Sequence, residues 1–264
     1  MTATAESYPE YETRPRRRGR KLLIGLLVLL LVLGGLLVLA DRVAAGAAER
    51  AIAEQAGRET AKRQISSTTP DVSIGGFPFL TQVLDGRYES ITINVRDAQG
   101  PVQDRTVRLP RLEITARDVT ASLSTLRSGQ GDVRAASVDG TGVIAYDSVA
   151  QFISQPGVKL AERDGKLGVS LPVDLLGQQF TVNGIGVLTV DDQGRVSLKF
   201  EDLNAEGVPN VPLARSLLTG YAKRISIRVP LPELPYDLRV REVRVLPEGL
   251  EVSATAKDVP LNAA

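Results

Sequence analysis

The side chains that could do chemistry in this chain are serine, lysine and the carboxylates, because its 264 residues include no histidine and no cysteine. A Ser-His-Asp triad, a Cys-His dyad, a zinc site built from cysteine or histidine, and an iron–sulfur cluster are all excluded. Nucleophilic catalysis without histidine favours a serine–lysine pair, yet no serine is followed by lysine three residues later. We therefore expect no enzyme, no catalytic residue, no cofactor and no metal site.

Adjacent carboxylates do not indicate a catalytic site either. Asp191-Asp192 leads into Gln193-Gly194, a sequence typical of a tight turn. Glu201-Asp202 follows a predicted strand, and we interpret it as a solvated strand end. Gly184-Ile185-Gly186 matches no phosphate-binding loop and indicates a bend or bulge in a strand. A hydrolase using carboxylates alone would need acids clustered in a cleft, which the sequence does not predict.

The composition predicts an aliphatic core. There is no tryptophan, Met1 is the only methionine, and aromatic residues make up 4% of the chain. The net charge is +1, and the six basic residues before position 40 leave the remainder close to neutral. A body without excess positive charge does not indicate nucleic acid as a partner.

The N-terminal forty residues predict a membrane anchor. Residues 1–20 are polar and arginine-rich, as in a disordered cytoplasmic tail. From Leu22 to Ala40 the side chains are only Leu, Ile, Val, Gly and Ala, and a helix of this length spans roughly 29 Å, the thickness of a bilayer core. We expect a transmembrane signal-anchor at 21–40, with the N-terminus inside and the body, 41–264, outside the cytoplasm.

A cleaved signal peptide is the alternative to an anchor. Val43-Ala44-Ala45 provides small residues of the kind that signal peptidase reads. Cleavage would make the body a secreted protein. In both cases the body lies in the cell envelope or beyond it.

The body predicts an α+β fold. Asp41 to about Ser66 has a helical composition with a weak apolar stripe. Period-two patterns then predict strands with Ile91, Ile93 and Val95 on one face and Leu112, Ile114 and Ala116 on the next. Hairpins are predicted over 182–200 and 238–254, with turns at 191–194 and 247–249.

Further connections and two short helices complete the expected elements. Asp139-Gly140 and Asp164-Gly165 indicate connections between strands. Helical spacing predicts one helix over Asp147–Gln155, capped by Asp147 or Ser148, and another over Pro212–Arg224.

The most unusual segment runs from Ile74 to Gln82. It places two of the five phenylalanines, Phe77 and Phe79, on either side of Pro78 and directly after a glycine pair. One interpretation is a buried corner that anchors the first strand. The other is that these rings form part of the mouth or lining of an apolar cavity.

This segment, together with Gly142-Val143-Ile144-Ala145-Tyr146 and the closing Leu-Pro-Glu-Gly-Leu-Glu-Val, resembles the LmeA-type phospholipid-binding proteins of actinobacterial cell envelopes. The resemblance covers roughly residues 40–260. It implies a fold similar to the tubular lipid-binding, BPI-like domains, in which a long helix packs along a strongly curved, mostly antiparallel sheet. It also implies phospholipid binding, without covalent chemistry, in the maintenance of envelope lipid or glycolipid.

On this resemblance we expect ten residues to bind lipid: Phe77, Phe79, Leu80, Leu84, Tyr88, Tyr146, Phe152, Ile153, Leu217 and Tyr221. Arg87 and Arg111 are candidates for contact with the headgroup. The expected partners are phospholipid, the membrane and a membrane enzyme such as an envelope glycosyltransferase, with no nucleic acid. The alternative function is a non-enzymatic envelope adaptor that docks a membrane enzyme through exposed strands.

Overall fold

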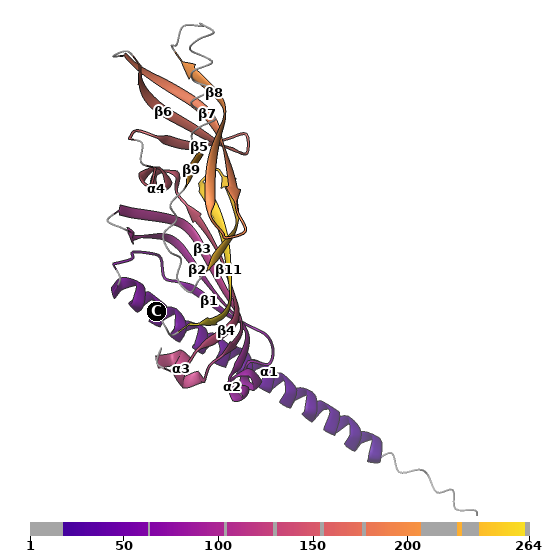
Figure 1. Cartoon of the computed structure of the whole chain (residues 1–264). Helices are drawn as coiled ribbons and strands as arrows, with labels where there is room; N and C mark the ends of the chain where they lie inside the picture. Colours follow the sequence, from indigo (N-terminus) through magenta and orange to yellow (C-terminus); the bar gives the residue numbers. More distant parts are fainter. Residues whose placement is uncertain are drawn as a thin grey trace, which may run out of the picture. The chain divides into compact units, whose positions relative to one another are not determined.

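The computed structural model describes residues 18–62, 64–102, 105–128, 131–153, 156–175, 178–206, 226–228 and 238–261. The chain divides into two compact units, Met1–Val43 and Ala44–Ala264. Helices and strands are both present, and every strand pairing that the structure describes is antiparallel (Figure 1). The expected α+β fold with a long N-terminal apolar helix is therefore confirmed.

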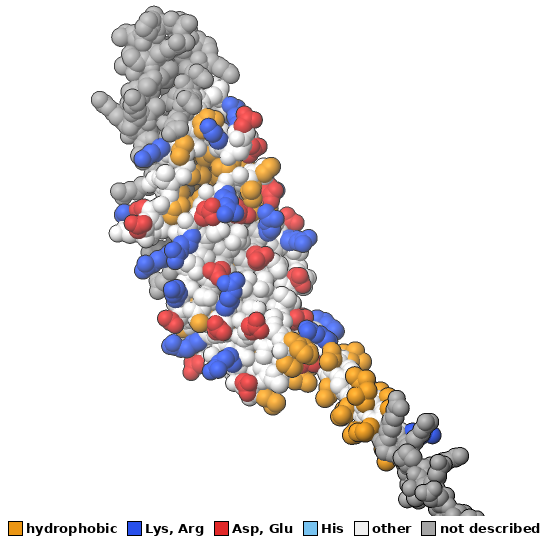
Figure 2. All heavy atoms as spheres, turned by 90° about the vertical axis from the view of Figure 1, so that its right-hand side faces the viewer, with side chains coloured by type: hydrophobic (Ala, Val, Ile, Leu, Met, Phe, Trp, Pro, Cys, Tyr) orange, Lys and Arg blue, Asp and Glu red, His pale blue; other side chains and the backbone are white. Residues whose placement is uncertain are grey.

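Helix α1 (Arg18–Lys62) begins in the first unit and ends in the second. The predicted tail extended to residue 20, but the helix already begins at Arg18, and its last residue is Lys62 rather than Ser66. Its apolar side chains from Leu22 to Leu39 are exposed, and Figure 2 shows them gathered on this segment. Among the described residues, this helix alone is long and apolar enough to cross a membrane.

The second unit contains two sheets. The larger has six strands in the order β1-β2-β3-β4-β11-β10. Its strands are β1 (Asp71–Gly75), β2 (Arg87–Val102), β3 (Arg105–Thr120), β4 (Arg134–Ile144), β10 (Arg239–Leu246) and β11 (Gly249–Pro260). The smaller has five strands in chain order: β5 (Lys159–Arg163), β6 (Lys166–Leu175), β7 (Gln178–Val190), β8 (Val196–Glu206) and β9 (Ser226–Arg228). Three short helices complete the unit: α2 (Phe79–Asp85), α3 (Leu123–Ser128) and α4 (Tyr146–Gln151).

Both predicted hairpins are confirmed, as β7–β8 and β10–β11. The turn at Asp164-Gly165 is also present, between β5 and β6. At the expected bulge, the pairing of β7 with β8 shifts register between Asn183 and Ile185. The carboxylate of Asp191 accepts backbone N–H bonds from Gln193 and Arg195, as its place in a tight turn predicts.

Four local predictions need correction or fall outside the described residues. Asp139-Gly140 does not connect strands but lies within β4. Glu201-Asp202 lies inside β8 rather than at its end. The helix predicted at 147–155 is shorter, and its N-cap is Ala145, because Asp147 and Ser148 already lie in its first turn. The helix predicted at 212–224 lies outside the described residues.

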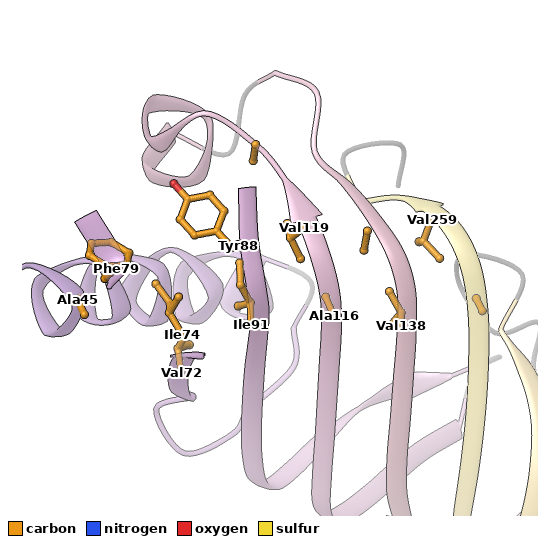
Figure 3. Packing of buried hydrophobic residues seen from close by; sticks show 13 residues of the cluster. Ala45, Val72, Ile74, Phe79, Tyr88, Ile91, Ala116, Val119, Val138 and Val259 are labelled. Atoms are coloured by element: carbon orange, nitrogen blue, oxygen red, sulfur yellow. The ribbon is translucent and has the colours of Figure 1, made fainter. Parts of the chain in front are cut away.

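The main core lies between the second-unit part of α1 and one face of the six-stranded sheet. Phe79, Tyr88, Ile91, Val119 and Val138 are among its buried members, drawn with their neighbours in Figure 3. From α1 this core receives mainly small side chains, which let a helix lie close to a sheet: Ala44, Ala45, Ala48, Ile52 and Ala53. This packing agrees with the expected long helix against an antiparallel sheet. We call this the first cluster.

A second cluster joins the two sheets. Its buried residues come from α4, from β6 and β8 of the smaller sheet and from β11 of the larger one: Val149, Leu167, Val169, Leu198 and Leu250. Half-buried side chains of β4 and β10 pack against it, among them Ile144 and Val245. The larger sheet therefore contributes side chains to two separate cores along the length of its strands.

Three aspartates adopt a left-handed backbone within the strands of the larger sheet. Asp97, Asp118 and Asp258 have φ of 50°, 49° and 52°, a region in which aspartate is tolerated better than most residues. Each follows a basic residue and precedes a small apolar one that is at most 4% exposed. Asp118 and Asp258 lie on opposite sides of β4, and strand pairing is interrupted at both. The register of pairing is the same on either side of each interruption.

Candidate lipid-binding face

The two faces of the larger sheet differ in chemistry, and this difference defines the candidate site. Directly paired residues of an antiparallel sheet place their side chains on the same face. One such row belongs to the first cluster and consists of Ile91, Ala116, Val138 and Ala256. The two rows that follow along the strands carry only aliphatic and small residues: Ile93, Ile114, Gly140 and Ala254, then Val95, Leu112, Gly142 and Val252. We call these two rows the apolar strip.

The apolar strip lies between the two cores. On one side is the first-cluster row, and on the other is the row of Ile144, Leu250 and Val245, which belongs to the second cluster. Most strip residues are only half-buried, including Ile93, Leu112, Ile114 and Val252. The strip crosses β2, β3, β4 and β11, which at ~4.8 Å between strands is roughly 14 Å. It is therefore an aliphatic surface that the chain itself covers only in part.

Glycine leaves room in the middle of this strip. Among the residues that the structure describes, no heavy atom lies within 4 Å of a Cβ added to Gly140, so this position has room for a side chain. At Gly142 the nearest atom would be the Leu112 Cδ1 at 3.4 Å, an ordinary contact. Ala254, beside Gly140 on β11, is also small, and it is buried. The described part of the chain therefore leaves room for added carbon atoms at Gly140.

The opposite face of the same strands is polar. Hydroxyls pair across the strands, with 3.1 Å between the Oγ1 atoms of Thr92 and Thr115. Arg117 donates to the Asp139 carboxylate at 2.9 Å. Such exposed ion pairs add little stability but keep their face in water. Figure 2 shows basic and acidic side chains interspersed over the visible face of the body.

The predicted headgroup arginines do not lie on the apolar strip. Arg111 pairs with Val143, a strand position on the polar face, and its guanidinium lies 3.1 Å from the Glu248 carboxylate. The prediction that Arg111 binds a headgroup is therefore not supported by its position. Arg87 is exposed at the start of β2.

Of the residues expected to bind lipid, Phe79 and Tyr88 are buried in the first cluster, 4% and 0% exposed. Their ring centroids are 6.4 Å apart, and Figure 3 shows Phe79 near Ala45 of α1. Burial raises the pKa of the Tyr88 phenol. The Tyr88 hydroxyl has no hydrogen-bond partner among the described residues. Of the two phenylalanines predicted for a buried corner, Phe79 is therefore buried, together with Tyr88, whereas Phe77 is exposed.

Phe77, Leu80 and Leu84 lie on or just before α2 and point outward, with exposed fractions of 55%, 39% and 85%. The structure thus separates them from Phe79, although all four belong to one short segment. Sequence spacing did not predict α2, and so did not reveal which of these side chains face the core.

Tyr146 begins α4 and packs against the second cluster, whereas Phe152 and Ile153 directly follow α4. The Tyr146 hydroxyl donates to the Leu246 carbonyl, and burial, with the nearby Glu162 charge, raises the pKa of this phenol. Ile153 is buried, and the Arg105 guanidinium lies 5.1 Å from the Phe152 ring centroid. Leu217 and Tyr221 lie outside the described residues.

The strip itself was missed as a site. The period-two patterns of β2 and β3 correctly place their aliphatic residues on one face, but the composition of Asp139-Gly140 predicts a connection rather than part of β4. The available signal was the pair Gly140 and Gly142, spaced two apart between Val138 and Ile144. This spacing puts both glycines on the face of the neighbouring aliphatic residues.

Asp191 is a described carboxylate whose pKa is shifted by its place in a turn. The pKa of Asp191 is lowered chiefly by the backbone N–H of Arg195, with help from the Arg195 side chain. A carboxylate stabilised in its charged form inside a turn is a structural feature. Among the described residues, no group of three potential metal ligands comes together.

A half-covered aliphatic strip between two cores, on an antiparallel sheet packed against a helix, is typical of a lipid-binding domain. The family model described as LmeA-like phospholipid-binding matches residues 39–255, so the chain belongs to this family. A search of curated proteins found no match to the chain, and a search of solved structures found none either.

Proposed function

We propose that the body, residues 41–264, binds phospholipid by laying acyl chain over the apolar strip, on the outer side of the cytoplasmic membrane. Membership of a phospholipid-binding family supports the ligand. The observation that carries the location is the room for a side chain at Gly140 within a row of aliphatic and small residues. No step of covalent chemistry is involved.

The energetics favour exchange over permanent capture. Burying hydrocarbon contributes about 0.8 kcal/mol per CH₂, but a membrane offers a chain nearly the same gain. The difference between the two environments is therefore small. Such a protein can take up phospholipid and return it, which suits a carrier or presenter in the upkeep of envelope lipid or glycolipid.

The residues expected from the sequence have different parts in this proposal. Phe79 and Tyr88 support the first-cluster side of the strip from within the core. Tyr146, which packs against the second cluster, bounds the other side, and Phe152 and Ile153 stay candidates for contact with the ligand. Leu217 and Tyr221 stay candidates for contact with the ligand.

We also propose that residues 21–40 anchor the body, with the N-terminus in the cytoplasm. The apolar part of α1 and the basic residues that precede it support this orientation. Because the chain has no cysteine, one introduced cysteine gives an unambiguous label. A membrane-impermeant maleimide should label Gln193→Cys in intact cells but not Thr4→Cys, and the reverse result would contradict the orientation.

Photo-crosslinking tests the lipid site directly. Full-length protein is reconstituted in vesicles containing a phospholipid with a photoactivatable diazirine in one acyl chain. After irradiation, crosslinked peptides should come from β2, β3, β4 and β11. Crosslinks confined to residues 21–40 would show that lipid only surrounds the anchor. A stable membrane-enzyme complex without strip crosslinks would favour the adaptor instead.

A further inference from the structure

Helix α2 is apolar on both of its sides. Phe79 and Val83, four residues apart, pack into the first cluster. Leu80 and Leu84, also four apart, lie on the other side and are 39% and 85% exposed. Phe77, just before the helix, is 55% exposed. We call Phe77, Leu80 and Leu84 the α2 tip.

The α2 tip is held firmly, so its exposure is not that of a loose loop. The Gln82 side chain donates to the Gly75 carbonyl at 3.1 Å and accepts from the Glu89 N–H at 2.8 Å. The helix ends at Gly86, which has φ of 63° and whose carbonyl accepts from the Ala121 N–H at 2.9 Å. With Phe79 fixed in the core, the helix cannot rotate to bury Leu84. A fixed apolar group of this kind marks a contact surface.

The short connection between the apolar segment of α1 and the first cluster indicates what the α2 tip contacts. Ala45 is buried in the same cluster as Phe79, and it follows Ala40, the last residue of the apolar segment, by five positions. Five residues cover about 7.5 Å as a helix and at most about 18 Å when extended. If residues 21–40 cross a bilayer, Ala45, which belongs to the same cluster as Phe79 of α2, stays within that distance of its surface.

We propose that the α2 tip inserts into the outer surface of the bilayer, so that Phe77, Leu80 and Leu84 contact membrane lipid rather than a chain held on the apolar strip. This inference rests on the membrane anchoring given above as the proposed function. Exposed Asp85, Arg87 and Glu89 follow the tip, as charged residues do where an apolar wedge meets the headgroup region. The occupant is a lipid surface, because the tether keeps one within reach.

Site-specific fluorescence tests the inference in the full-length chain. A single cysteine carrying the environment-sensitive dye NBD is placed at Leu84→Cys. Because the Leu84 side chain is exposed, this substitution should leave folding unchanged. Gln193→Cys, exposed in the turn between β7 and β8, is the matched control. Leu31→Cys reports on the span itself. The proteins are reconstituted in phosphatidylcholine–phosphatidylglycerol vesicles with or without lipids bearing a doxyl quencher near the headgroup end of the acyl chain.

The inference predicts blue-shifted emission at Leu84→Cys and quenching several-fold stronger than at Gln193→Cys. Quenching at Leu31→Cys with none at Leu84→Cys would overturn the inference and leave the anchor intact. Absence of quenching at both positions would overturn the anchor, and the inference with it. A second tip variant, Leu80→Cys, should behave like Leu84→Cys, and a solvent-like spectrum there would also contradict insertion.

Discussion

Replacing Gly140 with valine should separate lipid binding from folding. The new Cβ would have room on the apolar strip, between Ile114 and Ala254. Glycine inside a strand costs roughly 0.5–1 kcal/mol relative to alanine, and valine suits a strand well. The free energy of unfolding should therefore stay constant or rise by about that amount.

Lipid binding should weaken. The three carbons of the valine side chain would take the place of about three acyl CH₂ groups, each contributing ~0.8 kcal/mol, for a total of ~2.4 kcal/mol. At 1.4 kcal/mol per tenfold change in affinity, the loss is roughly 50-fold.

The assay is the concentration of diazirine phospholipid that gives half-maximal crosslinking, measured beside urea unfolding followed by circular dichroism. Thr141→Val is the matched control, because Thr141 is the next residue of β4 and lies on the polar face, 3.3 Å from the Ser253 hydroxyl. A folded Gly140→Val protein that crosslinks like the parent would refute the strip as the binding site. Equal weakening in both variants would refute it as well.

Three further results are expected. Phe79→Ala removes a buried ring and should lower the free energy of unfolding by about 3–5 kcal/mol. Leu84→Ala removes an exposed side chain and should change that free energy by at most ~0.5 kcal/mol. Urea titration of both variants measures the difference. Asp258→Val forces a β-branched residue into a left-handed backbone and should cost about 1–2 kcal/mol, whereas Asp258→Asn should be nearly neutral, which thermal unfolding of both variants measures. Burial raises the pKa of Tyr88 above its ordinary value of 10.0. The stability that this phenol contributes is therefore complete below pH 10 and is lost as the pH rises through the folded-state pKa. Tyr88→Phe should make the unfolding midpoint fall less steeply above pH 10.

The strands and hairpins could be predicted because their signals are local. Alternating Ile91, Ile93 and Val95 show their face directly, and Asp191 to Gly194 has the composition of a turn. The division into two sheets could not be predicted, because it depends on which distant strands pair. The pairing of β11 with β4 joins residues more than a hundred positions apart.

Local signals predicted the wrong structure where a pair of residues suits both a connection and a strand. Asp139-Gly140 has the composition of a connection, yet its two residues serve opposite faces of β4: Asp139 pairs with Arg117, and Gly140 leaves room over the strip. The triplets around Asp97, Asp118 and Asp258 carried a signal that was overlooked. A basic residue, an aspartate and a small apolar residue recur in that order, and each marks an interruption within a strand.

The glycines of β4 are difficult to explain by folding alone. Each weakens a strand interior by roughly 0.5–1 kcal/mol relative to alanine, and neither Gly140 nor Gly142 has a positive φ that would require glycine. At Gly140 no atom of the described residues excludes a side chain either. The first and second clusters, on either side, supply buried apolar area without help from these positions. A sheet stabilised from both sides can keep room at Gly140, and in the proposed function an acyl chain would fill it.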